Sequence, residues 1–338
     1  MRKLLLGTTA LAAAATLSAN AAIADISISG SYEWSYNSLS SNQTSLDGTS
    51  FGSDSEIKFT FTNKTDSGLT ITAVSELEAD GDGTSTMDES SISISGGFGK
   101  IVLGKNDSVG DNFGIEAEDL IAEESAPNGA SATVSTDTDI IAASGDDNKV
   151  SYFLPAMGGF TAGKSHTTTK TNTTNTTENK TTTVTGATDS TEYGAKDTTA
   201  AAGSTVTIGA ATGTTETASG TPDTDSQNIG VKIVNGPLSV ILAQSSFEAD
   251  DEDREANGAS ISYKLGNGMT IGAYTMESDD ALDAGEEYSK SGAEVQYVIA
   301  SGLTAVVTID DYEYKQGTGG SGTSDSGTNS KLTIKASF

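Results

Sequence analysis

The stretch SGAEVQYVIASGLTAVVTIDDYEY, residues 291–314, has the pattern that the rest of the chain repeats. Apolar and polar residues alternate in each half, and the glycine-containing turn sequence at residues 300–302 separates the halves. A period of two interrupted by a tight turn is typical of a β-hairpin. Comparable hairpins are predicted at residues 55–77, 90–105, 149–164, 192–214, 228–247 and 257–276. The chain is therefore predicted to be an all-β protein made of consecutive hairpins.

Two single strands complete the pattern, one at residues 26–36 and one at residues 331–338. Together with the hairpins they give sixteen strands, and the connections are alternately short and long. These features predict a 16-stranded antiparallel transmembrane β-barrel with short turns at the periplasmic side. The predicted extracellular loops are residues 37–52, 80–89, 106–148, 166–190, 215–227, 248–256, 277–288 and 315–328.

Alternation also predicts which side chains face lipid and which face water. In the last strand Leu332, Ile334 and Phe338 share one face, whereas Lys331 and Lys335 share the other. Single strands of a soluble β-sandwich alternate in the same way. Here, however, the inner face is polar in strand after strand, so it cannot be a protein core. The sequence therefore favours a water-filled interior, which is a channel.

The first 24 residues read as a secretory signal peptide. Arg2 and Lys3 precede an apolar run over residues 4–17, and small residues follow at two candidate cleavage sites, after Ala21 and after Ala24. The run is shorter than the roughly 18 to 20 apolar residues that a membrane-spanning helix needs. We expect residues 25–338 to form the mature barrel.

The charge of the chain restricts its partners. The formal net charge is −29, and removal of Arg2 and Lys3 with the leader makes it more negative still. Such a chain cannot bind nucleic acid through phosphate contacts, whereas inorganic cations and small cationic solutes suit its field. The chain contains no cysteine, which is compatible with export to the Gram-negative envelope.

Several stretches together resemble the general porins of Gram-negative bacteria, most closely those of α-proteobacteria of the Rhodobacter type. They are the strand ISISGSYEWSY at residues 26–36, GGFGKIVLGK at residues 96–105, SYFLPAMGGFTAG at residues 151–163, and the terminal Phe338. The resemblance implies an integral outer-membrane barrel, usually a homotrimer, which lies among outer-membrane lipid and lipopolysaccharide. It also implies passive diffusion of small hydrophilic solutes and ions without catalysis. Phe338 resembles the assembly signal that the barrel insertion machinery reads.

In this family the third loop folds inward and forms the pore constriction, and here that loop is residues 106–148. Its carboxylates are Asp107, Asp111, Glu116, Glu118, Asp119, Glu123 and Glu124, and residues 106–147 contain no lysine or arginine. The segment IEAEDLIAEE, residues 115–124, has apolar residues near helical spacing and predicts a short helix packed on the inner wall. Inward-pointing Lys58, Lys331 and Lys335 are expected on the opposing wall. The alternative is an acidic loop that stays outside the barrel.

Other sequence patterns do not indicate a specific metal site or catalytic site. The segment DGDGTSTMDESS, residues 80–91, lacks the glycine and the final glutamate of an EF-hand, so only loose Ca²⁺ binding by loop carboxylates stays open. We expect no other cofactor, and the single histidine, His166, does not suggest a zinc site or a catalytic triad. The Thr- and Asn-rich tract at residues 167–185 reads as a solvated extracellular loop. Two alternatives to a general channel remain, namely a substrate-specific channel for sugars or other small solutes and a surface adhesive barrel.

Overall fold

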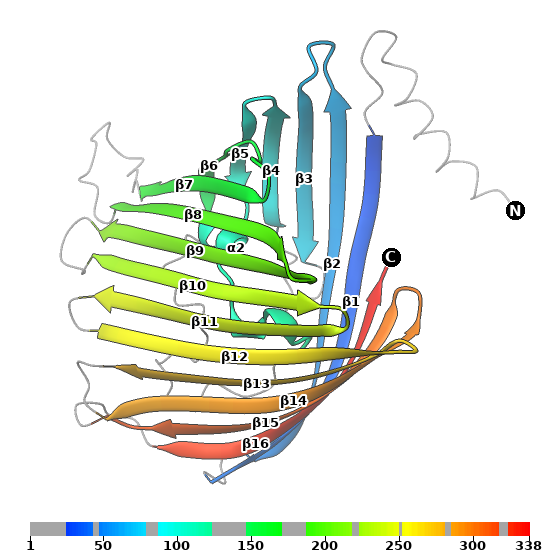
Figure 1. Cartoon of the computed structure of the whole chain (residues 1–338), viewed down its shortest axis with the longest axis vertical. Coiled ribbons are helices and arrows are strands. Elements are labelled where there is room, and N and C mark those ends of the chain that lie inside the picture. Colours follow the sequence, from blue (N-terminus) through cyan, green and yellow to red (C-terminus); the bar gives the residue numbers. More distant parts are fainter. Residues whose placement is uncertain are drawn as a thin grey trace, which may run out of the picture.

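The computed structural model describes residues 25–42, 47–78, 87–123, 147–170, 187–217, 223–249, 252–280, 285–317 and 324–338. These residues form one closed sheet of antiparallel strands, β1 to β16, in which each strand pairs with its neighbours in the sequence and β1 pairs with β16 (Figure 1). The strands are β1 (Asp25–Ser41), β2 (Gly48–Lys64), β3 (Thr70–Glu78), β4 (Met87–Gly96), β5 (Gly99–Lys105), β6 (Asn148–Phe153), β7 (Phe160–Lys170), β8 (Ala187–Ala201), β9 (Ser204–Thr217), β10 (Thr224–Asn235), β11 (Leu238–Ala249), β12 (Glu252–Gly266), β13 (Met269–Asp280), β14 (Glu286–Ala300), β15 (Leu303–Lys315) and β16 (Asp325–Ser337). The predicted 16-stranded barrel is confirmed.

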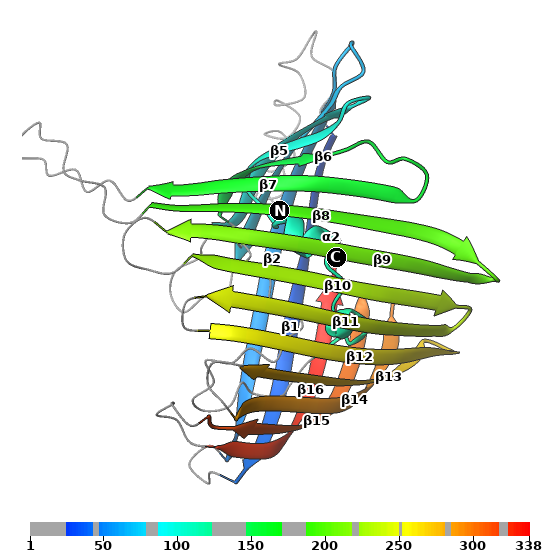
Figure 2. The same ribbon diagram turned by 60° about the vertical axis from the view of Figure 1, so that its left-hand side comes forward.

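The barrel closes through its two ends. Strand β16 runs antiparallel to β1, and beyond the last paired strand residue the backbone N–H of Phe338 donates to the carbonyl of Gly30 at 3.0 Å. Gly30 returns a hydrogen bond from its N–H to the carbonyl of Phe338 at 2.9 Å. In Figure 2 strands β1 and β2 cross behind β8 to β16 because strands on opposite walls of a tilted barrel run in different directions. The chain-terminal residue is thus part of the closure.

The strands are longer than the hydropathy pattern predicts, always at the end toward the long connections. Residues 37–41 and 48–52, which were expected in a loop, continue the ladder with pairs such as Leu39 to Gly48. Strands β11 and β12 likewise replace most of the loop that was expected at residues 248–256. Polar residues occupy both faces of these strand ends, so the apolar alternation stops before the backbone pairing does. The predicted loop boundaries were therefore wrong by several residues, although the order of connections was right.

The two faces of the sheet differ as predicted. Outward positions carry exposed apolar side chains, among them Ile28, Phe61, Ile229, Ile261 and Leu332. The inward partners on the same strands are mostly serine, threonine, lysine and glutamate. This alternation is what a barrel with lipid outside and water inside requires.

Short turns join the strands at one end of the barrel. The turn between β12 and β13 consists of Asn267 and Gly268, both with positive φ, at 48° and 81°. Two such residues in succession match the twist of the strands that they join, which explains the Asn-Gly sequence at this point. Every turn at this end of the barrel is short, as the sequence predicts.

Among the residues described, no helix has the length and apolar character needed to cross a membrane. Two short helical elements follow β5, namely α2 (Val109–Phe113) and the 3₁₀ turn η1 (Ala117–Leu120). The helix predicted over residues 115–124 is present only as the single 3₁₀ turn η1, and the α-helix α2 lies before that range. Gly114 and Glu116 have extended ψ angles of 157° and 154°, so the chain leaves the helical conformation between α2 and η1.

Some expectations fall outside the described residues. They concern the leader at residues 1–24, Glu124, and most of the Thr- and Asn-rich tract. At the start of that tract, residues 167–170 extend β7.

Candidate functional site

Residues 106–123, here called the inner segment, run along the inside of the barrel wall from β7 to β16. Helix α2 contacts β7, β8 and β9, and η1 contacts β11, β12 and β13. The wall residues that contact this segment lie at inward positions. Along each strand these positions alternate with the exposed apolar ones. Figures 1 and 2 both place α2 within the ring of strands.

The inner segment is attached where it leaves β5. The ammonium of Lys149 on β6 donates to the carbonyl of Asn106 at 2.5 Å, and the N–H of Asp107 donates to Oε1 of Glu89 on β4 at 3.1 Å. Ser108 then caps α2 by accepting from the N–H of Asp111 at 3.1 Å, while Asp111 accepts from the N–H of Ser108 at 3.0 Å. Such a reciprocal capping box favours a helix start at this position.

The first turn of α2 is bonded to the wall through a buried glutamate. The N–H of Gly110 donates to Oε2 of Glu192 at 3.3 Å, and Ser165 Oγ donates to the same oxygen at 2.8 Å. Ser165 Oγ also accepts from the N–H of Val109 at 3.3 Å. These wall residues therefore satisfy N–H groups that a helix start leaves without intrahelical partners.

Inward glycines make room for the apolar residues of the inner segment. A Cβ at Gly194 would lie 2.7 Å from Cβ of Phe113, and a Cβ at Gly230 would lie 2.5 Å from Cβ of Ile115. Gly163 and Gly209 leave similar space beside Phe113 and Ile115. Glycine in a strand interior marks a place where another part of the chain approaches closely. These positions were a signal in the sequence that our reading did not use.

Asn228 on β10 fixes the middle of the segment. Its Oδ1 accepts from the N–H of Ile115 at 3.1 Å, and its Nδ2 donates to the carbonyl of the same residue at 3.3 Å. Ile115 also packs with Ile241 and Ala243, and farther along Ala117 packs with Tyr274 and Met276. The wall thus binds both the backbone and the side chains of the segment, which explains why residues 114–116 are extended rather than helical.

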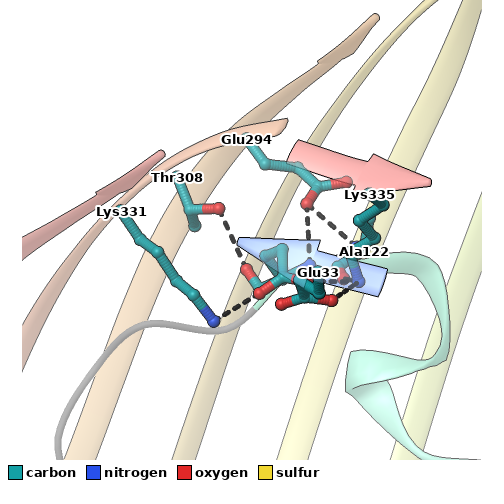
Figure 3. A network of polar contacts seen from close by, with 7 residues as sticks. Glu33, Ala122, Glu294, Thr308, Lys331 and Lys335 are labelled. Atoms are coloured by element: carbon teal, nitrogen blue, oxygen red, sulfur yellow. Dashed lines mark hydrogen bonds and ion pairs between the residues drawn. The ribbon is translucent and has the colours of Figure 1, made fainter. Parts of the chain in front are cut away.

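The far end of the segment is held by a polar network (Figure 3). Glu294 on β14 accepts from the N–H groups of Ala122 and Glu123 at 2.9 and 3.3 Å. Thr308 on β15 donates to the carbonyl of Glu123 at 3.0 Å. The carboxylate of Glu123 forms ion pairs with Lys331 and Lys335 on β16, and Lys335 also pairs with Glu33 on β1 at 3.2 Å. Four strands therefore converge on this end, which we call the latch.

The ionisation of Glu123 is strongly influenced by the latch. Burial opposes its charged form, but the hydrogen bonds and charges of Lys331 and Lys335 outweigh burial and hold the pKa of this carboxyl below its ordinary value of 4.5. A lowered carboxyl pKa gives stabilisation that is present above the ordinary pKa and lost as the pH falls through the folded-state pKa. The latch should therefore persist to pH values below 4.5.

This leads to a test of the latch by pH. We expect the single-channel conductance to stay at one level from neutral pH down to about the ordinary carboxyl pKa, and new conductance levels to appear only below it. The Lys331→Gln variant loses one of the two charges that lower the pKa of Glu123, so burial raises that pKa relative to the wild type. The new conductance levels should therefore appear at higher pH. Conductance records over a pH series for both proteins check this. Identical pH thresholds would contradict a role for Lys331 in the latch.

The structure distributes the predicted constriction carboxylates over three environments. Asp107, Asp111 and Asp119 are exposed, Glu116 and Glu118 are half-buried, and Glu123 is buried in the latch. Glu124 lies outside the described residues. The side chains exposed to the interior are thus a subset of those expected.

Two of the three predicted basic residues are not placed as expected. Lys331 and Lys335 were expected across the pore from the loop, yet both contact it through Glu123. Lys58 lies on β2, on the wall opposite β10 as expected, and forms an ion pair with Glu76 on β3. Which inward lysine lies beside which part of a loop depends on the path of the loop, and no local sequence pattern specifies that path.

Two lysines that the sequence reading did not single out lie beside the inner segment. Lys196 on β8 lies two residues after the inward glycine Gly194, and Lys232 on β10 lies two residues after the inward glycine Gly230. Both lysines therefore share the inward face. Lys196 interacts electrostatically with Asp119 and Glu116 of the segment and with Lys232. The carboxylates of the segment therefore face bases on the wall that carries it.

The opposite wall is acidic. In a ring of sixteen strands β2 lies half-way round from β10. Inward positions on β2, β3 and β4 carry Glu56, Glu76, Glu78 and Glu89 around Lys58. Within the described ranges no group of three or more His, Cys, Asp or Glu side chains is placed to hold a metal ion. These carboxylates form an acidic surface on this wall.

A closed barrel with a loop segment fixed along its inner wall is the geometry of a channel, and comparison with known proteins agrees. The sequence pattern described as Gram-negative porin matches residues 7–317. The chain belongs to the Gram-negative porin family. It is accordingly an integral protein of the outer membrane, and its family and fold point to a channel rather than an enzyme.

Solved structures similar to this porin share its fold at low sequence identity. The anion-selective porin from Comamonas acidovorans is 16% identical, with a TM-score of 0.63, and the match covers 93% of this chain and 100% of that chain. A trimer form of OmpT, an outer membrane protein of Vibrio cholerae, is 13% identical with a TM-score of 0.65, covering 93% and 99%. A variant of the Rh. blastica porin is 17% identical with a TM-score of 0.63, covering 93% and 100%. No curated protein sequence gave a significant match.

Proposed function

We propose that this porin is a cation-preferring, water-filled channel for the passive diffusion of small hydrophilic solutes and inorganic ions. The observation that carries the proposal is the charge of the inner segment, which has six carboxylates and no lysine or arginine over residues 106–123. One of them, Glu123, is neutralised by lysines in the latch, so the others supply the field along the water path.

The charge of the wall opposite the segment also favours cations over anions. Four glutamates on β2 to β4 surround Lys58. Coulombic interaction between close charges is stronger in a narrow, poorly screened channel than at an open surface. Lys196 and Lys232 oppose this effect locally. A similar fold in an anion-selective porin means that side chains, not the barrel, decide the sign.

The proposal is tested by reconstitution in planar bilayers. Under a KCl gradient the zero-current potential should have the sign of K⁺ permeation. Replacing K⁺ by a larger cation should change the conductance more than replacing Cl⁻ by a larger anion. Added sugars distinguish the alternatives, because a general channel shows no saturable block by sugars, whereas a sugar-specific channel does. A zero-current potential of the opposite sign would reject cation preference, and the absence of conductance would favour a surface adhesive role.

We further propose that the protein is a homotrimer in outer-membrane lipid and lipopolysaccharide, after removal of residues 1–24 and delivery by the insertion machinery. The trimer form of the similar OmpT protein supports this assembly. Light scattering in mild detergent would distinguish a trimer from a monomer. No cofactor is part of the proposal, and weak Ca²⁺ binding by the loop carboxylates remains a separate hypothesis.

The terminal Phe338 provides a test of assembly. Its exposed ring lies at the end of β16, and its backbone exchanges two hydrogen bonds with Gly30. Deletion of Phe338 should reduce the amount of folded, heat-modifiable protein in the outer membrane at least several-fold, while the channels that do insert keep their conductance. Replacement of outward-facing Phe61 by alanine is a matched control for the loss of one exposed aromatic ring. Normal insertion of the deletion variant would contradict the assignment.

A further inference from the structure

A groove lies on the outer surface of the barrel, across strands β7 to β12. Its volume is about 720 Å³, and its floor consists of small residues that include Ala162, Ala195 and Ala210. Exposed Tyr193 and Ile229 also line the groove. These residues occupy outward positions, so the groove opens toward lipid rather than toward the channel.

The rim of the groove at β7 carries two basic side chains. Lys164 is exposed on the outward face, and its ammonium lies 4.9 Å from the ring centroid of Tyr193. His166, two residues farther toward the long-loop end, has Nδ1 3.0 Å from Thr191 Oγ1. The ammonium of Lys164 and the second ring nitrogen of His166 are thus placed to meet a ligand from the lipid side.

This pair differs in charge from the surface around it. The outward-facing charged side chains that the structure describes on β8 to β13 are carboxylates, namely Asp189, Asp197, Glu216, Asp225, Glu248, Asp253, Glu255, Glu277 and Asp279. Glu255 lies in the lining of the groove, on β12 and away from β7. An anionic group entering the groove is therefore favoured at the β7 side and disfavoured at the β12 side.

We propose that the groove binds one phosphorylated glycolipid of the outer leaflet. An acyl chain lies over the small residues beside Tyr193 and Ile229, and a phosphate is bound by Lys164 and His166. The small residues provide a depression in which a hydrocarbon chain packs closely against the wall. Because the chain comes from the bilayer and not from water, close packing and the phosphate contacts favour binding, not a hydrophobic transfer. The inference rests on the proposed contact of the barrel with lipopolysaccharide and assigns that contact a place and a chemistry.

The groove is close to the inner segment. Gly163, Gly194 and Asn228 line it on the outside and contact Phe113 or Ile115 on the inside. The wall at this point is one backbone layer thick. The side chains chosen for mutation face the lipid and point away from the channel, so their replacement should leave the conductance unchanged.

A fluorescent reporter at the groove tests the proposal in the full-length protein. Trp34→Phe removes the single tryptophan, and Tyr193→Trp then places a reporter at the groove that keeps an aromatic ring beside Lys164. Tyr297→Trp in the same background is the control, because Tyr297 is an outward tyrosine with 44% exposure against 50% for Tyr193. Both proteins are reconstituted in nanodiscs of dibrominated phosphatidylcholine, whose chains quench tryptophan.

Bis-phosphorylated lipid A is then added at a mole fraction too low to dilute the brominated lipid appreciably. We expect the groove reporter to lose more than half of its quenching and the control reporter to lose almost none. Dephosphorylated lipid A should have no such effect, and Lys164→Gln with His166→Gln should abolish the protection. Equal behaviour of the two reporters would overturn the proposal. Shielding of the groove reporter from brominated lipid in a trimer without lipid A would also overturn the proposal. The groove would then be a contact between copies of the chain. Single-channel conductance of the same variants separates this result from the proposed channel function, which does not depend on it.

Discussion

Conversion of Glu116, Glu118 and Asp119 to their amides is expected to reduce the zero-current potential under a KCl gradient by more than half. These side chains belong to the part of the inner segment that lies along the wall near Lys196, and none of them is among the latch residues. Without these carboxylates, the positive charges of Lys196 and Lys232 on the wall are no longer offset by nearby negative charges. The loss should be largest at low salt, because the screening length rises from about 10 Å at 0.1 M to about 30 Å at 0.01 M ionic strength.

The control for this experiment uses carboxylates outside the channel. Asp253, Glu255 and Glu277 are exposed at outward positions of β12 and β13, so their conversion to amides changes the net charge by the same amount. We expect the control variant to keep nearly all of the zero-current potential. If both triple variants lower it equally, selectivity arises from the diffuse charge of the protein and the inner segment is not the filter. The single Glu123→Gln change is informative as well, because Glu123 is already paired and should affect the potential less than Glu116 does.

Replacement of Gly230 by valine is expected to lower the single-channel conductance by at least half and to make it fluctuate between levels. The added Cβ would lie 2.5 Å from Cβ of Ile115 and would also collide with its carbonyl oxygen. Strand β10 is fixed on both sides by its neighbours, so the inner segment must move off the wall toward the water path. Planar-bilayer records of heat-modifiable, folded protein measure the effect.

Ala273→Val adds bulk at an outward position of β13 and is the matched control, with an expected conductance close to that of the wild type. A second variant, Asn228→Ala, loosens the same part of the segment without adding bulk. It removes two hydrogen bonds to Ile115, each contributing about 1 kcal/mol, and should give fluctuating conductance in a folded barrel. An unchanged conductance in folded Gly230→Val protein would show that the position of the segment does not control the channel.

The sequence by itself determined the barrel. Alternation with a period of two, seen for example at Leu332, Ile334 and Lys335, is a local property that each strand displays without reference to any other. Turn residues such as Asn267 and Gly268 fixed where the hairpins reverse, since few other residues adopt their backbone conformation. The count of strands, the order of short and long connections and the inward or outward direction of each side chain followed from these local rules. Strand ends could not be placed in this way, because backbone pairing continues where both faces are polar.

Only the tertiary structure decided how the third loop is held. Asn228 binds Ile115, and Glu294 binds Glu123, across more than one hundred residues of sequence. No local pattern specifies such pairs, since they depend on the direction in which the loop enters the barrel. The same holds for Lys331 and Lys335, whose inward direction was predictable but whose contact with Glu123 was not. A side chain's face is set by the period of its own strand, whereas its partner is set by the packing of segments that are distant in the sequence.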